Sequence, residues 1–286
     1  MITMNKEEYI KITKKRYKGK FGKKAIGKTI MINQINNFYN AMNNYKQEKH
    51  NYSIGDRVYL KKGTLLHGTY KNIEGLEEIV KNGLVSSWFI DARNSKYPSS
   101  VGVWNLKQDY YLDEYINFYS GGTVKYYNQQ DNNSETKIIK YNELNTFIDD
   151  FKSKDYLVWK MEQTKEARFL PSLAQNKVQI GIIFNSDNEE IKALLKNDIL
   201  SLNMSDEDVK DFVNEKYYPQ FIKDRQHKDD FFTDRESAIL FGIPSCFIEG
   251  ILVGRDYEKD ENMLNRIKEL LPNSYICNLD GTIIKN

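Results

Sequence analysis

Two short segments carry the residues best suited to chemistry. His67-Gly68-Thr69 ends an apolar-leaning run typical of a strand, and a helix-like stretch follows it and closes at Asn82-Gly83-Leu84. Far downstream, Glu236 comes just before the strand-like run 238–241. A carboxylate can hydrogen-bond a hydroxyl group and stabilise positive charge that develops in a transition state. Taken singly, His-Gly-Thr can end any strand, and Glu236 is an ordinary candidate for a surface salt bridge.

Aromatic residues stand between these two segments. Trp104 lies in the short apolar run 101–106, and Tyr115 follows eleven residues later in a Tyr-rich stretch predicted as a helix. Taken singly, each is more typical of a core aromatic than of a ligand contact. Tyr119, on the same predicted helix, is a competing candidate for stacking on a planar group.

The order and spacing of these residues resemble the ADP-ribosyltransferases, in the histidine-containing branch of diphtheria toxin and the poly(ADP-ribose) polymerases. The resemblance covers residues 57–119 and 231–255. It implies that the substrate is NAD, whose nicotinamide–ribose bond is cleaved through a transition state like an oxocarbenium ion. In that branch, a late Glu at the start of a strand is the catalytic carboxylate, which implies this role for Glu236.

The same resemblance implies the residues that hold NAD. His67 would bind the adenosine-side ribose, and the Gly68 backbone would hold the nicotinamide amide with Thr69 nearby. Trp104 and Tyr115 would flank the nicotinamide ring, and Tyr119 competes for that role. The branch usually has Tyr where this chain has Trp104, so the flat face is kept and the hydroxyl is lost.

Further residues bear on the ligand and on the target. The loop before the catalytic Glu often touches the target in this superfamily, which implies contacts by Asp234, Phe231 and Phe232. Arg93 resembles an Arg that DNA-modifying ADP-ribosyltransferase toxins carry after their first helix. Its guanidinium fork could bind a diphosphate; an ordinary loop arginine is the plainer interpretation.

Short strands mixed with helices, without regular strand–helix alternation, favour an α+β fold. The resemblance implies a split two-sheet core. We expect a basic N-terminal helical extension over residues 1–52, a catalytic domain over 53–286, and a helical elaboration around 187–228. The apolar patterning predicts helices at 31–50, 72–81, 110–119, 142–162 and 259–271, and strands at 57–60, 65–69, 101–106, 178–184, 238–241 and 251–253.

Composition limits the function classes. The net charge is only +2 with 29% charged residues, so no overall field argues for nucleic acid, although lysines crowd residues 11–28. Cys246 and Cys277 are expected as buried thiols in a reducing compartment, with a disulfide as the alternative. We see no metal-ligand spacing, no signal peptide and no membrane span. We therefore expect a cytoplasmic protein, or one delivered into a target cell.

These observations predict a mono-ADP-ribosyltransferase that uses NAD as substrate and needs no metal. Its acceptor would be a macromolecule, protein or nucleic acid, and its context a bacterial toxin or effector with an antitoxin or immunity partner. An NAD glycohydrolase would use the same site with water as acceptor. An inactive fold that binds nucleic acid or protein, through residues such as 11–28, is the alternative outside enzymes.

Overall fold

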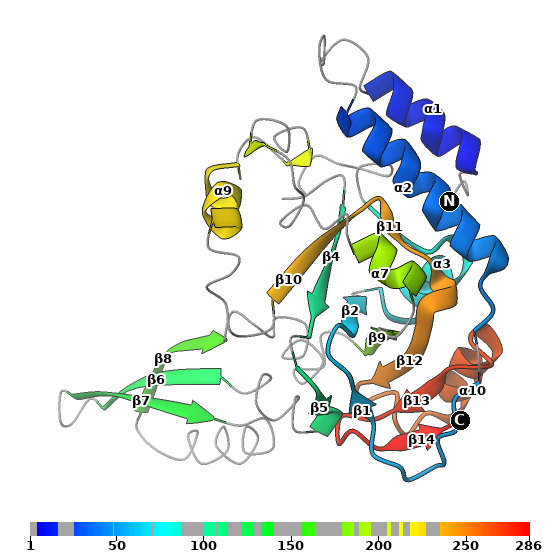
Figure 1. The fold of residues 1–286 in the computed structure, drawn as a ribbon. Helices are drawn as coiled ribbons and strands as arrows, with labels where there is room; N and C mark the ends of the chain where they lie inside the picture. Colours follow the sequence, from blue (N-terminus) through cyan, green and yellow to red (C-terminus); the bar gives the residue numbers. More distant parts are fainter. Residues whose placement is uncertain are drawn as a thin grey trace.

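A seven-stranded mixed sheet forms the centre of the protein in the computed structural model (Figure 1). The structure describes residues 5–16, 26–47, 49–69, 71–86, 100–106, 108–113, 122–128, 133–139, 156–163, 179–185, 189–195, 205–206, 212–213, 218–226 and 235–286. The strand order is β10-β4-β2-β9-β12-β13-β14, in which only β12 and β13 pair in parallel. Their bounds are β2 Leu65–Thr69, β4 Ser100–Asn105, β9 Ile180–Phe184, β10 Arg235–Leu240, β12 Ile248–Val253, β13 Tyr275–Cys277 and β14 Ile283–Lys285.

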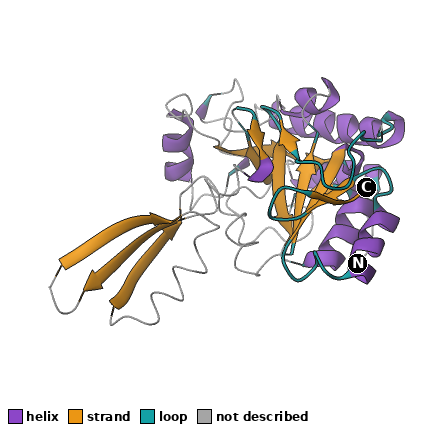
Figure 2. Cartoon of the chain, turned by 90° about the horizontal axis from the view of Figure 1, so that it is seen from below, coloured by secondary structure: helices purple, strands orange, loops and turns teal. Residues whose placement is uncertain are grey.

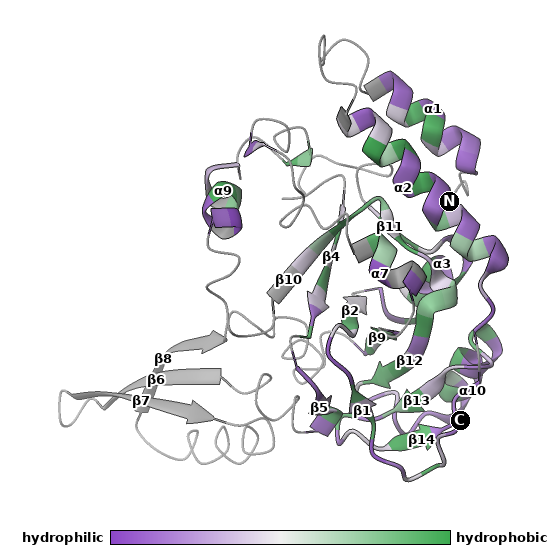
Figure 3. Ribbon diagram, viewed as in Figure 1, coloured by the Kyte–Doolittle hydropathy of each residue, from purple (hydrophilic) through white to green (hydrophobic). Residues whose placement is uncertain are grey.

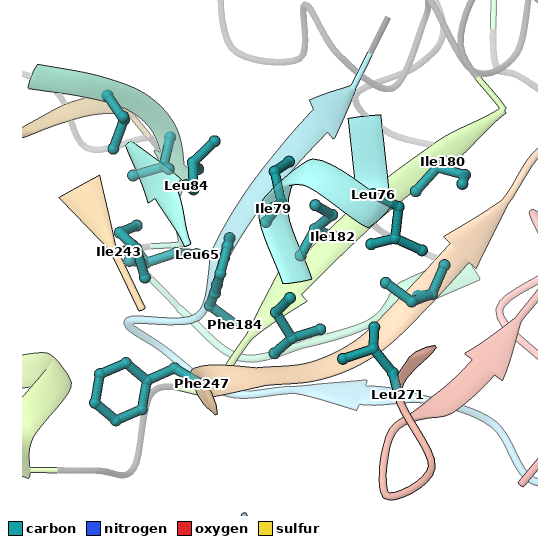
Figure 4. Packing of buried hydrophobic residues seen from close by; sticks show 14 of the residues in the cluster. Leu65, Leu76, Ile79, Leu84, Ile180, Ile182, Phe184, Ile243, Phe247 and Leu271 are labelled. Atoms are coloured by element: carbon teal, nitrogen blue, oxygen red, sulfur yellow. The ribbon is translucent and has the colours of Figure 1, made fainter. Parts of the chain in front are cut away.

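The middle strands of this sheet are apolar because both of their faces are covered. All five residues of β9 are buried, as the uninterrupted apolar run near 178–184 predicts. Leu65 and Ile182 belong to a helix-side core, which packs beneath the helices α3 (Asn72–Asn82) and α10 (Glu261–Leu270). Leu66 and Ile183 belong to a second, loop-side core on the opposite face. Figure 4 shows the side chains of α3 lying over those of β2 and β9 in the helix-side core.

The two covering helices match the predicted bounds, 72–81 and 259–271, to within two residues at each end. In α3, Leu76 and Ile79 face the core, and the Gly83 N–H donates to the Ile79 carbonyl at 2.7 Å as the helix closes. Gly83 has φ 74° and ψ 169°, a backbone conformation that is open almost only to glycine. In α10, the Asp260 carboxylate caps the helix by accepting from the Met263 N–H at 3.1 Å.

The N-terminal helices α1 (Lys6–Arg16) and α2 (Ile26–Asn44) are built into the fold. Figure 3 shows both with polar and apolar residues interleaved along their length, as expected of surface helices. Tyr9 of α1 and Phe38 of α2 pack against Phe241, which directly follows β10. The described part of α1 is therefore a packed helix rather than a free basic arm. Among the described residues, no helix is both long enough and apolar enough to cross a membrane.

In the part of the chain that the structure describes, three smaller sheets accompany the central one. β1 (Tyr59–Leu60) pairs with β5 (Tyr110–Tyr111), and β11 (Gly242–Ile243) pairs with β3 (Leu84–Val85). The third sheet, which Figure 2 draws beside the central one, contains β6 (Gly122–Asn128), β7 (Asn133–Ile139) and β8 (Tyr156–Gln163). The remaining elements are short: α7 (Glu189–Leu195), α9 (Tyr218–Gln226) and the 3-10 helix η5 (Ser245–Phe247).

Two predicted helices are wrong in part. The helix predicted over 142–162 runs into β8, which pairs with β6 along its length. The helix predicted over 110–119 begins instead with strand β5, because Tyr111 pairs with Tyr59 of β1. The mixed α+β class agrees with the structure, whereas the division of the core into the two sheets of an ADP-ribosyltransferase stays a prediction.

Candidate functional site

The three candidate motifs lie on three adjacent strands of the central sheet. His67 is on β2, Trp104 on β4 and Glu236 on β10, and the strands lie in the order β10-β4-β2 (Figure 1). Trp104 pairs with Glu236 on one side and with Leu66 on the other. Since neighbouring strands are about 4.8 Å apart, the Glu236 backbone lies about 10 Å from that of Leu66. The pairing of β4 with β10 joins segments that are 132 residues apart, as for Asn105 and Ser237.

His67 bridges an opening between β2 and β4. The backbones of these strands pair at Leu65 and Leu66. At His67, the ring Nδ1 instead donates to the Gly102 carbonyl at 3.0 Å. Burial lowers the pKa of His67, and the hydrogen bond to Gly102 opposes this only in part. The ring is therefore neutral near pH 7, with Nδ1 as donor and Nε2 as an acceptor for a group such as a sugar hydroxyl.

Glycines of neighbouring strands bring bare backbone to one face of the sheet. Gly68 of β2 pairs with Gly181 of β9, and Gly102 of β4 pairs with Ala238 of β10. Gly102 lies two residues from Trp104, so alternation puts it on the face that Trp104 occupies. Gly68 and Gly102 are half-buried. A surface without side chains lets a ligand approach the main chain closely, which is one use of glycine within strands.

Trp104 offers an unused hydrogen-bond donor at this place. Its side chain packs against the loop-side core, with Leu66. Its Nε1 is buried and finds no hydrogen-bond acceptor among the described residues. A buried donor without a partner costs about 1–3 kcal/mol, and a bound ligand that accepts from it would recover this cost. The indole thus supplies a donor, as well as the flat face expected from the sequence.

The structure places Gly68 and Thr69, which the resemblance groups together, on opposite faces of the sheet. Trp104 packs with Leu66 in the loop-side core, whereas Leu65 belongs to the helix-side core on the other face. By strand alternation, Gly68 shares the face of Trp104, whereas the Cβ of His67 starts on the face of Leu65. Thr69 is also on the helix side: it is buried, and a Cβ at Gly75 of α3 would lie only 2.0 Å from its hydroxyl oxygen. Thr69 therefore packs beneath α3, and Gly68 is the better placed of the two to meet a ligand.

Several expected site residues lie outside the described residues: Arg93, Tyr115, Tyr119, Phe231, Phe232 and Asp234. Glu236 is placed through its backbone, as part of β10. Sequence reasoning missed the contribution of Gly102 and Gly181. The signal for both was a glycine inside an otherwise apolar strand, in Val-Gly-Val-Trp and in Gln-Ile-Gly-Ile.

Comparison of the chain with protein families, with curated proteins and with solved structures finds no match.

Proposed function

We propose that this protein is a mono-ADP-ribosyltransferase, which cleaves NAD and transfers ADP-ribose to a macromolecule. One observation carries the proposal: three motifs chosen from residue types, order and spacing fall on three neighbouring strands, with Trp104 paired directly opposite Glu236. The acceptor, protein or nucleic acid, and an antitoxin or immunity partner belong to the same proposal.

The described residues offer groups that fit NAD. Trp104 has a buried N–H without an acceptor among the described residues, which the nicotinamide amide or a ribose oxygen can satisfy. The half-buried backbone at Gly68 and Gly102 allows close approach to the main chain. The His67 side chain starts on the other face of the sheet, but its ring reaches the Gly102 carbonyl of β4. With Nδ1 held there, neutral His67 can accept from a ribose hydroxyl through Nε2.

These positions suggest which part of the reaction each residue would support. When bound, NAD supplies the nicotinamide–ribose bond, and nicotinamide is its leaving group. Glu236, as an anion at the start of β10, would accept from a ribose hydroxyl and stabilise the positive charge that develops on the sugar. The hydrogen bond to Gly102 would fix the His67 ring before the substrate arrives, so that little ordering remains to be done on binding.

Nicotinamide release from NAD tests this proposal. Purified wild type is compared with Glu236→Gln, which keeps size and removes charge. The matched control is Glu269→Gln on the exposed face of α10, where 66% of the side chain is accessible. We expect Glu236→Gln to lose about 100-fold or more of the release, and the control to keep it.

Addition of cell lysate then separates two reactions at the same site. Release that depends on lysate identifies a transferase, and release without lysate identifies a glycohydrolase. Absence of release under both conditions, together with no effect of NAD on the melting temperature of the wild type, would overturn the proposal and favour an inactive binding fold.

A further inference from the structure

Two cavities adjoin at the end of the central sheet where β9 ends and β12 begins. Their volumes are about 450 and 370 Å³. Both are lined by His50, Asn51, Asn185 and Glu249, and we call them together the sheet-end groove. His67 and Trp104 do not line either cavity. The groove is within the size range of small-molecule sites, and neither of these two candidate NAD-binding residues belongs to its lining.

The wall of the groove is held in place by contacts of its own. The segment after α2 crosses the sheet end, where the Gln47 side-chain amide donates to the Ile248 carbonyl and to Ser274 Oγ. The His50 ring stacks on Tyr52 at 6.0 Å between centroids and meets the edge of buried Tyr275 at 5.4 Å. Such a wall keeps its shape without a ligand, which lowers the cost of ordering on binding.

Among the described residues that line the groove, lysines outnumber carboxylates. Lys46 and Lys49 line the first cavity and Lys61 lines the second, and all three are exposed. Glu249 is the carboxylate that lines both, with its Oε1 at 3.6 Å from His50 Nδ1. Burial lowers the pKa of His50, so the ring adds little positive charge near pH 7.

Lysines near the first cavity also repel one another electrostatically. Lys268 has a lowered pKa, mainly through burial and then through the charges of Lys49 and Lys285. Lys49 and Lys268 therefore lie close enough for their positive charges to act on each other. An anionic group would be stabilised there.

The middle and the far end of the groove suit a different part of a ligand. The Asn51 and Asn185 amides and the Glu249 carboxylate offer donors and acceptors for sugar hydroxyls. In the second cavity, Tyr59 is 41% exposed, and its hydroxyl donates to Asp109 at 2.9 Å, which steadies the ring. An exposed and anchored aromatic ring can stack on a planar base.

We propose that the sheet-end groove binds a nucleoside phosphate. The phosphates lie toward Lys46 and Lys49, the sugar hydroxyls meet Glu249, and the base lies toward Tyr59. This orientation follows from the lining: Lys46 and Lys49 line only the first cavity, Glu249 lines both, and Tyr59 lines only the second. The site does not depend on NAD cleavage by the neighbouring strands.

Calorimetric titration with ADP and, separately, with pyrophosphate tests this site. Lys46→Glu/Lys49→Glu is expected to weaken both probes by about tenfold or more, because it reverses the charge where the phosphates lie. Its matched control is Lys81→Glu/Lys259→Glu, which makes the same charge change at exposed positions that do not line the groove. This control should keep the affinity of the wild type within about threefold.

Glu249→Gln separates the sugar from the phosphates. It should weaken ADP, which loses a hydroxyl acceptor, and leave pyrophosphate equal or tighter, because a like charge is removed. No binding of ADP by the wild type at millimolar concentration would overturn the proposal. So would ADP binding that is equal in the groove and control variants, or ADP binding that survives Lys46→Glu/Lys49→Glu and is lost in His67→Gln, since that binding belongs to the other site.

Discussion

Phe241 is a bulky residue in a conformation that normally belongs to glycine. Its φ is 64°, directly after β10, and its side chain is fully buried. The ring packs edge-on against Phe38 at 4.9 Å and Tyr9 at 5.1 Å between centroids. A left-handed backbone costs a residue with a Cβ about 1–2 kcal/mol, so the packing of the ring must offset this strain.

This strain predicts that the usual difference in stability between an alanine and a glycine variant is cancelled or reversed at Phe241. Both Phe241→Ala and Phe241→Gly lose the ring, at about 3–5 kcal/mol. Alanine keeps the left-handed strain, whereas glycine removes it and adds about 0.5–1 kcal/mol of unfolded-chain entropy. We therefore expect Phe241→Gly to be as stable as Phe241→Ala or up to about 1.5 kcal/mol more stable.

Ile239 provides the comparison, because it is fully buried two residues earlier within β10. At this regular strand position, Gly should be less stable than Ala by about 1 kcal/mol. Free energies of unfolding from urea titration of the four variants give both differences, provided that their denaturant slopes agree. If glycine is disfavoured by the same amount at both positions, Phe241 carries no backbone strain and the reasoning is refuted.

Three further outcomes are expected. Gly250→Ala should destabilise by about 1–3 kcal/mol or more, since its Cβ would lie 2.2 Å from the ring of buried Tyr275; thermal unfolding of this variant measures the loss. The free energy of unfolding should fall as the pH drops below 6.5, because folding lowers the pKa of His67 from that value and the unfolded chain binds the proton first. Urea titrations between pH 5 and about 8 should show that this free energy depends less on pH in His67→Gln than in the wild type. Asp260→Ala should cost about 1 kcal/mol through the lost cap on the Met263 N–H, and Asp260→Ser should recover most of it; equal losses for both in chemical denaturation would contradict a capping role.

Local patterns in the sequence identify many elements of the central fold correctly. The helix predicted over 72–81 matches α3, and the strand predicted over 178–184 matches β9 to within two residues. Both carry signals within their own segment: an apolar stripe followed by Gly83 in the first, and an unbroken apolar run in the second.

Elements defined by distant partners were harder to predict. Tyr110 and Tyr111 form a strand because β1 lies beside them, where the Tyr59 and Tyr111 rings meet at 5.2 Å. β8 likewise depends on pairing with β6. A helix-like composition in one segment says nothing about such a partner, and tertiary pairing overrides propensity.

The candidate site likewise combines features that the local sequence predicts with features that depend on distant partners. Residue types and order single out His67, Trp104 and Glu236, but nothing local predicts that their strands are neighbours. Nor does the sequence predict that His67 would bond the Gly102 carbonyl in an opening between strands, or that Trp104 would keep an N–H without an acceptor among the described residues. These features arise from the pairing of strands, which only the folded sheet defines.

The strand order has a consequence for how the protein folds as it is synthesised. On a ribosome, β2 and β4 emerge long before β9 and β10, and β2 is the neighbour of both β4 and β9. The pairing of β4 with β10 closes a loop of more than a hundred residues, a slow step for a folding chain. The proposed catalytic carboxylate is therefore added to the site only when about four-fifths of the chain has been made.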